Sequence, residues 1–384
     1  MADSVQIGTL FGIPIRLHFT FLLVIPLFTF IVGYQIEYTI LFLEGVFNLA
    51  QPIDTSLITR GFVPYSLGLI VTLSLFAGVL LHELSHSIVA KKNGMKVKSI
   101  TLLILGGIAA IDEGKSPDPK VELPMAIAGP VASLIIGLIS GFLAYASYNY
   151  ISAPAFAGLL FYVFGYLSFL NIILFLFNLI PAFPMDGGRV LRAILARKMP
   201  MYKATKIAAD IGRAFAVIFG IAGILLFSPI LVIIAIFIYL GAGQEAEMMK
   251  FNELLRDVDV KRAMTSPVLS VDPDMPVDQV VNMMYSTHHL GFPVISRDEI
   301  IGMVTLSDLS RVSSIDREAM IVKDVMSTSV IVLPPEAPLS DAMKIMSVNS
   351  IGRIPVVENN RVVGIVTRTD ILKFIEIKEI YSKK

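Results

Sequence analysis

Long apolar runs separated by short polar loops fill the first 243 residues, and they constrain the fold more than any other feature. A helix needs about 20 apolar residues to cross a bilayer. Of all 384 residues, 55% are hydrophobic and 16% are charged, whereas soluble domains carry about 25% charged residues. We therefore predict a polytopic α-helical membrane protein with about six spanning helices, near residues 17–34, 66–90, 123–148, 156–180, 211–227 and 229–243.

The distribution of charge predicts how these helices are oriented. Lysine and arginine gather in the loops 91–122 and 181–206, whereas loop 35–65 has only Arg60 and loop 149–155 has neither. Because basic loops stay on the cytoplasmic side, we expect both termini of this multi-pass cell-membrane protein to be cytoplasmic. The short apolar run 40–49 is predicted to be interfacial or re-entrant. A net charge of zero argues against a nucleic-acid partner.

The second predicted span contains the sequence His82-Glu83-Leu84-Ser85-His86. Residues four apart share one face of a helix, so the two imidazoles can hold one metal ion. Glu83 beside them is placed to take a proton from a metal-bound water. Ionisable side chains in an apolar span are costly and usually functional. A hydrogen-bonded polar cluster, or a path for protons or ions, is the alternative interpretation.

A third metal ligand is expected from a second element, because the chain has no cysteine and only five histidines. The fourth span ends at Asn178 and is followed by Pro181, Pro184 and Asp186-Gly187-Gly188. Proline and glycine unwind a helix, which makes Asp186 the preferred candidate. The other candidates are His18, Asp112, Glu113 and Asp118, which an interfacial or solvated position would explain equally well.

Residues 97–112 are apolar and rich in β-formers, but Gly106-Gly107 interrupts them and they are too short to span. We predict a strand or hairpin beside the second span. Backbone that is not helical at membrane depth must be buried in protein or line a wet cavity.

Composition changes near Gln244, and residues 244–258 are predicted to be a helical connector. An internal repeat with an offset of 62 residues follows, as Met264 and Met326, Gly302 and Gly364, and Asp308 and Asp370 illustrate. Each copy is predicted to run strand, helix, strand, strand, helix. The predicted domains are therefore 1–243, the connector 244–258, and two α/β domains at 259–315 and 316–384.

The membrane half resembles the site-2 protease family of intramembrane metalloproteases. The resemblance rests on the His82 to His86 motif and on Asn178-x-x-Pro181-x-x-Pro184-x-Asp186-Gly187. It implies one zinc ion held by His82, His86 and Asp186, with Glu83 as general base and acid. It also implies that Asn178 donates a hydrogen bond to the substrate carbonyl or oxyanion. The substrate would be a membrane-spanning protein, unwound locally and paired with a strand near 103–109.

The repeated half resembles a tandem pair of cystathionine-β-synthase (CBS) domains, with the endings Gly302-Met-Val-Thr305-Leu-Ser-Asp308 and Gly364-Ile-Val-Thr367-Arg-Thr-Asp370. The resemblance implies that ATP, ADP or AMP binds between the copies. Thr305 and Thr367 would contact phosphate, and Asp308 and Asp370 the ribose hydroxyls. The alternative is that these residues only cap the helices that follow. Such pairs often self-associate, so a homodimer is expected.

Two functions follow from the sequence. The first is an intramembrane zinc metallopeptidase regulated by an adenine nucleotide. The alternative is an ion transporter or channel with a CBS regulatory module, in which His82, Glu83 and His86 line the ion path. Transporters often contain inverted repeats, and none is found in the membrane half.

Overall fold

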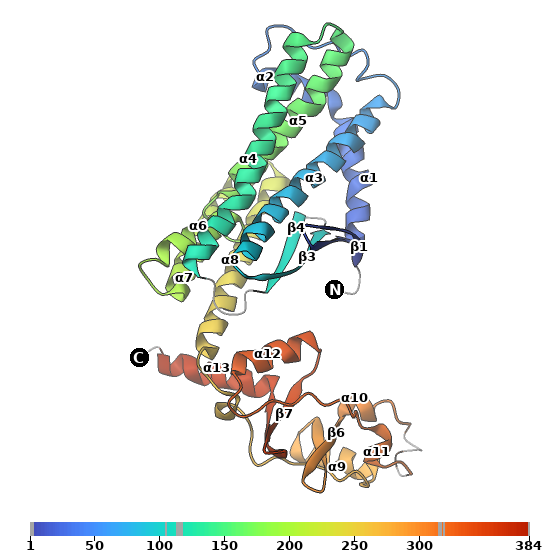
Figure 1. The fold of residues 1–384 in the computed structure, drawn as a ribbon, viewed down its shortest axis with the longest axis vertical. Helices are drawn as coiled ribbons and strands as arrows, with labels where there is room; N and C mark the ends of the chain where they lie inside the picture. The colour runs from blue at the N-terminus through green and yellow to red at the C-terminus, as the bar shows by residue number, and fades with distance from the viewer. Residues whose placement is uncertain (1–3, 104–105, 113–117, 314–316, 318, 383–384) are drawn as a thin grey trace. The chain divides into compact units, whose positions relative to one another are not determined.

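A computed structural model describes residues 4–103, 106–112, 118–313, 317 and 319–382. The chain divides into two compact units, Met1–Glu247 and Met248–Lys384, here called the N-terminal and C-terminal units. Each unit has its own hydrophobic cores. Figure 1 shows the helical N-terminal unit and the mixed α/β C-terminal unit.

Apolar helices make up most of the N-terminal unit, and five of the described helices are long and apolar enough to cross a membrane. The helices are α1 Phe19–Tyr34, α2 Ile36–Val46, α3 Val63–Lys92, α4 Pro119–Tyr150, α5 Pro154–Asn178, α6 Asp186–Leu195, α7 Met201–Leu225 and α8 Pro229–Leu255. The five are α3, α4, α5, α7 and α8, and α1 with α2 forms a pair bent by 70° that counts as a possible sixth span. The chain is a multi-pass α-helical membrane protein.

Several predicted helix bounds differ from those in the structure. The run predicted as interfacial or re-entrant is helix α2, which follows the bend after α1. Helix α7 begins at Met201, ten residues before the predicted span, because its first turns are polar and escape a hydropathy criterion. Helix α8 continues beyond 243 through the predicted connector to Leu255.

Helix α3 lies at the centre of the N-terminal unit, packed on α1, α4 and α5, and α4 packs along α5 (Figure 1). Small residues permit these close contacts, as is typical of helices in lipid. A Cβ at Gly68 of α3 would lie 2.5 Å from the Thr29 carbonyl oxygen of α1. Ser168 of α5 donates to the Gly137 carbonyl of α4 over 2.8 Å. The fold therefore holds α3 firmly against its neighbours.

A four-stranded sheet covers the part of α3 that carries the histidines. Its strands are β1 Ser4–Leu10, β2 Ile13–His18, β3 Lys96–Leu103 and β4 Gly106–Asp112, in that order. Strands β2 and β3 are parallel, and the other two pairs are antiparallel. Ile13, Ile15 and Ile100 pack on Leu84 of α3. The predicted hairpin is β3 and β4, whereas β1 and β2 were not predicted.

The C-terminal unit contains two antiparallel hairpins related by the sequence repeat. The first copy has η1 Val260–Arg262, α9 Val277–Thr287, β5 Gly291–Ser296, β6 Glu299–Thr305 and α10 Leu306–Leu309. The second has α11 Val322–Val325, α12 Leu339–Val348, β7 Arg353–Glu358, β8 Arg361–Thr367 and α13 Arg368–Ser382. Both hairpins have the same register and a bulge at the same position.

The two copies exchange the segments that begin each repeat. Met264 lies against Gly364, and Thr265 pairs with Ile365 in the second copy. In the same way Met326 lies against Gly302 of the first copy. The predicted bounds 259–315 and 316–384 follow the sequence repeat, whereas each buried core takes a segment from the other copy.

Candidate metal centre

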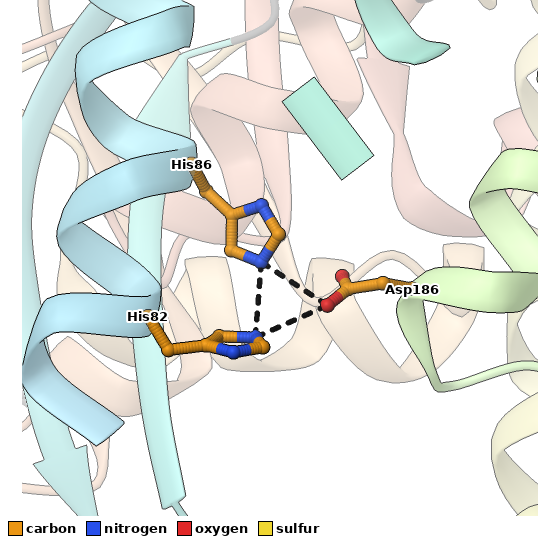
Figure 2. A group of neighbouring side chains, drawn as sticks. All are labelled: His82, His86 and Asp186. Atoms are coloured by element: carbon orange, nitrogen blue, oxygen red, sulfur yellow. Dashed lines mark hydrogen bonds and ion pairs between the residues drawn. The ribbon is translucent and has the colours of Figure 1, made fainter. Parts of the chain in front are cut away.

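Helix α3 places two imidazoles side by side in the interior of the N-terminal unit. His82 is 5% exposed and His86 is 8% exposed. Their ring centroids are 4.8 Å apart, and the two Nε2 atoms are 3.2 Å apart. The spacing of four residues on one continuous helix is sufficient to produce this arrangement. Figure 2 shows both rings on the same side of α3.

Asp186 reaches the same point from the opposite side. Helix α5 ends at Asn178, residues 179–185 turn the chain, and Asp186 is the first residue of α6. Its Oδ2 atom lies 3.1 Å from the Nε2 atom of His82 and 3.1 Å from that of His86 (Figure 2). The turn needs glycine at 187, because a Cβ there would overlap the backbone of residues 179–180.

The other candidates for the third ligand have different surroundings. The side chain of Asp118 caps α4 by accepting from the Lys120 amide over 2.9 Å. His18 caps α1, where its Nδ1 accepts from the Thr20 amide over 3.4 Å. Asp112 ends β4, and Glu113 lies outside the described residues. Among the described residues, only His82, His86 and Asp186 converge as a possible metal-binding group.

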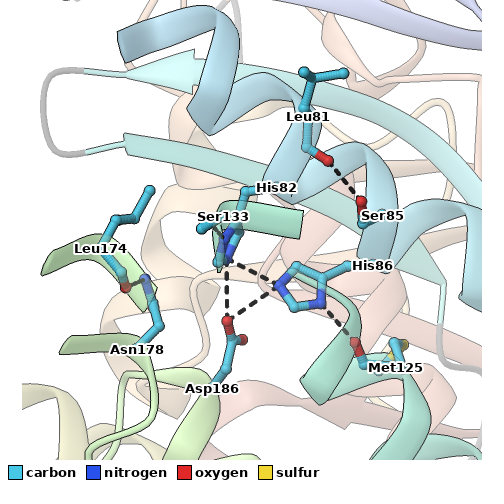
Figure 3. A network of polar contacts seen from close by, with 9 residues as sticks. All are labelled: Leu81, His82, Ser85, His86, Met125, Ser133, Leu174, Asn178 and Asp186. Atoms are coloured by element: carbon cyan, nitrogen blue, oxygen red, sulfur yellow. Dashed lines mark hydrogen bonds and ion pairs between the residues drawn. The ribbon is translucent and has the colours of Figure 1, made fainter. Parts of the chain in front are cut away.

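Helix α4 orients both imidazoles through their other nitrogens. The Nδ1 atom of His86 donates to the Met125 carbonyl oxygen over 2.6 Å, and Nδ1 of His82 is 2.9 Å from the Ser133 hydroxyl (Figure 3). A carbonyl only accepts, so the neutral His86 ring has its lone pair on Nε2, facing Asp186. Such outer contacts are typical of histidines that bind metals.

The three donor atoms fit a zinc ion. Two histidines and one carboxylate, with one place left for water, are the ligands of many catalytic zinc sites. Tetrahedral bonds of about 2.0–2.1 Å would separate the donor atoms by roughly 3.3 Å. The donor atoms here are 3.1, 3.1 and 3.2 Å apart. The arrangement is therefore suited to holding one small divalent cation.

Two close contacts define the space around the imidazoles and Glu83. A Cβ on Gly129 of α4 would overlap His86 Nε2 and lie 2.6 Å from His82 Nε2. A Cβ on Gly107 of β4 would overlap Glu83 Cγ and lie 3.4 Å from its Oε1. Glu83 therefore lies between α3 and the edge strand β4. No sequence motif indicates that Ser133 or the Met125 carbonyl belongs to the site.

Asn178 occupies the last turn of α5. Its Nδ2 donates to the Leu174 carbonyl of the same helix over 2.9 Å, as Figure 3 shows. This bond uses one of the two N–H donors of the Asn178 amide, and the other remains to donate to a substrate.

In the C-terminal unit, the four residues predicted to bind a nucleotide form two identical caps. The Asp308 carboxylate accepts from the Thr305 amide over 2.9 Å and from the Thr305 hydroxyl over 2.6 Å. Asp370 accepts from Thr367 at the same two distances. These contacts are those expected for helix capping, the alternative raised by the sequence.

Arg353 is a further cation in the C-terminal unit, and no sequence motif indicates it. Its guanidinium is half-buried and lies against Gly291, the residue at the equivalent position of the first copy. Burial lowers the pKa of Arg353 below its usual range. Within the described residues it forms no ion pair with a carboxylate.

Comparisons with known proteins agree with both halves of this description. The family model for peptidase family M50 matches residues 70–158 and 141–219, and the CBS domain model matches 256–314 and 322–377. Zinc metalloprotease MJ0392 of Methanocaldococcus jannaschii is 34% identical, over 99% of this chain and 98% of that protein. The protein Rip3 of Mycobacterium tuberculosis is 30% identical, over 98% of this chain and 94% of its own length.

A solved structure of a site-2 protease from Methanocaldococcus jannaschii is 38% identical and covers 63% of this chain and 95% of its own, with a TM-score of 0.40. The assignment rests on the full-length relatives and on the two family models, which fall on different halves of the chain. The chain therefore belongs to peptidase family M50, the site-2 protease family of zinc metalloproteases, and carries a tandem pair of CBS domains.

Proposed function

We propose that this metallopeptidase cleaves membrane-spanning segments of other proteins and that an adenine nucleotide bound to the CBS pair regulates it. The observation that carries the proposal is the convergence of His82, His86 and Asp186 on one point beside α3, a helix long and apolar enough to cross a membrane. A polar site at this position suits hydrolysis of a peptide bond in a segment that lies within the bilayer. Membership of family M50 favours this function over the ion transporter or channel.

The three converging side chains would hold one zinc ion per chain. When bound, zinc lowers the pKa of its water toward about 7 and polarises the carbonyl to be attacked. The Nε2 atom of His86 keeps its lone pair available because Nδ1 donates to the Met125 carbonyl, and the Ser133 hydroxyl orients the His82 ring.

Glu83 would move the protons of the reaction. Its carboxylate, placed between α3 and β4, takes a proton from the attacking water and then gives it to the leaving amine. Asn178 would donate the second hydrogen of its amide to the oxygen that becomes negative.

Strand β4 would hold the substrate. It is the edge strand beside Glu83, and it continues the sheet order after β3. A locally unwound substrate segment can add to such an edge by main-chain hydrogen bonds, which places its peptide bonds along the site. The predicted strand near 103–109 thus corresponds mainly to β4 at Gly106–Asp112, and residues 104–105 lie outside the described residues.

The C-terminal unit would bind the nucleotide. Thr305 or Thr367 would contact phosphate and Asp308 or Asp370 the ribose hydroxyls, using the carboxylate oxygens left free by the caps. Arg353 adds a half-buried cation that suits a phosphate.

The loop charges favour an orientation with this unit and both termini in the cytoplasm. A homodimer is also part of the proposal.

The test compares Glu83→Gln with wild type, using purified full-length protein and single-span membrane proteins as substrates. The variant should keep about one zinc per chain and lose proteolysis by roughly 10²–10⁴-fold, because only the proton acceptor is removed. Glu37→Gln, an exposed glutamate on α2, is the matched control and should cleave normally.

Metal analysis separates the two parts of the proposal. His82→Ala should lose zinc and activity together. Cleavage by Glu83→Gln at the wild-type rate would refute the role of Glu83. Wild-type protein without zinc, or full zinc content in His82→Ala, would refute the metal centre itself.

A further inference from the structure

A buried cluster of three charged side chains joins three helices in the N-terminal unit. Arg192 of α6 is 3% exposed, and its Nε donates to Glu122 of α4 over 2.8 Å. Its Nη2 donates to the same Glu122 oxygen. Its Nη1 donates to Glu245 of α8 over 2.5 Å. Glu122 is 1% exposed, so this pair is removed from water almost completely.

Stability alone gives little reason to bury such charges. Desolvating an ion pair costs about as much as its attraction returns, and apolar replacements are often as stable. What the cluster does provide is defined geometry, because the planar guanidinium presents its donors in fixed directions. Phe183, in the turn before Asp186, holds that plane from one side, with its ring centroid 5.0 Å from Cζ.

The linked helices are those that build the metal centre. Helix α4 orients His86 through the Met125 carbonyl, and Met125 lies three residues after Glu122. Helix α6 begins with Asp186, and Arg192 lies six residues further, about 9 Å along the axis. A link between Glu122 and Arg192 therefore fixes the carboxylate ligand relative to the helix that orients the imidazoles.

We propose that Arg192 is a positioning residue of the metal centre, which holds α6 on α4 through Glu122 and joins α8 to them through Glu245. The inference rests on the proposed zinc site. Helix α8 continues without a break to Leu255, whose side chain belongs to a core of the C-terminal unit. Glu245, with its side chain 30% exposed, is the outermost contact of the cluster. A shift of α8 would move Arg192 through Glu245, and with it helix α6, which begins with Asp186.

The experiment measures zinc binding directly rather than activity. Full-length Arg192→Lys, Glu122→Gln and Glu245→Gln proteins are purified, and zinc affinity is measured by competition with a chelator. Cobalt is then bound in place of zinc to record its visible absorption spectrum, and the unfolding temperature of the metal-free protein is measured. Arg197→Lys is the matched control, since Arg197 follows the same helix and is exposed.

Arg192→Lys and Glu122→Gln should weaken zinc binding about tenfold or more and change the cobalt spectrum, as loss of outer contacts does at other metal sites. Glu245→Gln should have a smaller effect because its side chain is partly exposed. Arg197→Lys should match wild type in all three measurements. The double variant Arg192→Met with Glu122→Met replaces the pair by apolar groups, and it should fold but bind zinc weakly.

Wild-type zinc affinity and an unchanged cobalt spectrum in Arg192→Lys would overturn the proposal while leaving the zinc site intact. The same holds if the variants lower only the unfolding temperature of the metal-free protein, because that result assigns the cluster a purely structural role. If Arg192→Lys does not fold, Glu122→Gln and the double variant decide by the same criteria. Absence of zinc from wild-type protein would instead refute the proposed function.

Discussion

Two glycines leave the space that the proposed metal ligands and Glu83, the proposed general base, occupy. Gly129 brings the backbone of α4 against both Nε2 atoms, and Gly107 brings β4 against the Glu83 side chain. A methyl group at either position would displace the side chain that it meets. Because different atoms are displaced, the two positions should affect different steps of the reaction.

Gly129→Ala should lose zinc and activity together, because its Cβ would overlap the two imidazole nitrogens that are proposed to bind the metal. Gly107→Ala should keep zinc but slow proteolysis roughly 10-fold or more, because it shifts the general base. Metal analysis and proteolysis of the same preparations check both. The control is Gly45→Ala on α2, where a Cβ meets nothing within 4 Å and both measurements should equal wild type. Zinc loss in Gly107→Ala, or full zinc content in Gly129→Ala, would contradict this assignment.

Elements rather than single residues determine how a substrate can reach the site. The sheet has two edges, β1 and β4, and β4 is the one that covers Glu83. Ile108 in this strand is 57% exposed. An edge strand presents main-chain groups that are not paired within the sheet, so it can accept a further strand. Strand β3 gives β4 its register, from Leu103 opposite Gly106 to Lys96 opposite Asp112.

Proline substitutions at Ile108 and Ala109 test whether substrate pairs with β4. Amide groups of neighbouring residues point to opposite edges of a strand, so one substitution removes a bond to β3 and the other a donor on the free edge. The substitution that removes a bond to β3 should lower the unfolding temperature. The substitution that removes a donor on the free edge should leave zinc content and unfolding temperature unchanged and reduce proteolysis of membrane-spanning substrates. If both variants cleave such substrates at the wild-type rate, pairing with β4 is excluded.

At the scale of the whole molecule, one helix belongs to both compact units. Helix α8 is apolar at its start, contributes Glu245 to the buried cluster, and ends at Leu255 in a core completed by the second CBS copy. The absence of cysteine from the sequence makes site-specific labelling of each unit straightforward.

Nucleotide binding is expected to change both proteolysis and the relation between the units. Cysteines introduced at Tyr150 and Tyr285, each 77% exposed, would carry a fluorescent donor and acceptor. Titration with ATP, ADP or AMP should change energy transfer and cleavage rate at the same concentration. Arg353→Ala should weaken both responses, whereas Arg361→Ala, whose side chain is 72% exposed, is the control. Unchanged transfer and unchanged proteolysis with all three nucleotides would exclude this regulation.

Local periodicity is what made much of this protein predictable. The span lengths, the pairing of His82 with His86 and the repeat offset of 62 residues depend on neighbours within a few turns or on direct sequence similarity. The helix break before Asp186 could be predicted because proline and glycine change the conformation of the backbone at their own positions. These features do not depend on which distant segments meet.

Contacts between distant segments were decided only by the tertiary structure. Strands β1 and β2 were not predicted because β2 pairs with β3, more than 80 residues away, and most of β1 is exposed. The Met125 carbonyl that orients His86 is a backbone group, which every residue has, so no side chain identifies it. Arg192 meets glutamates 70 and 53 residues away, and a single charge in a sequence does not identify its partner. The proposed ligands follow from helical spacing and a local break, whereas their orientation depends on long-range packing that has no local pattern.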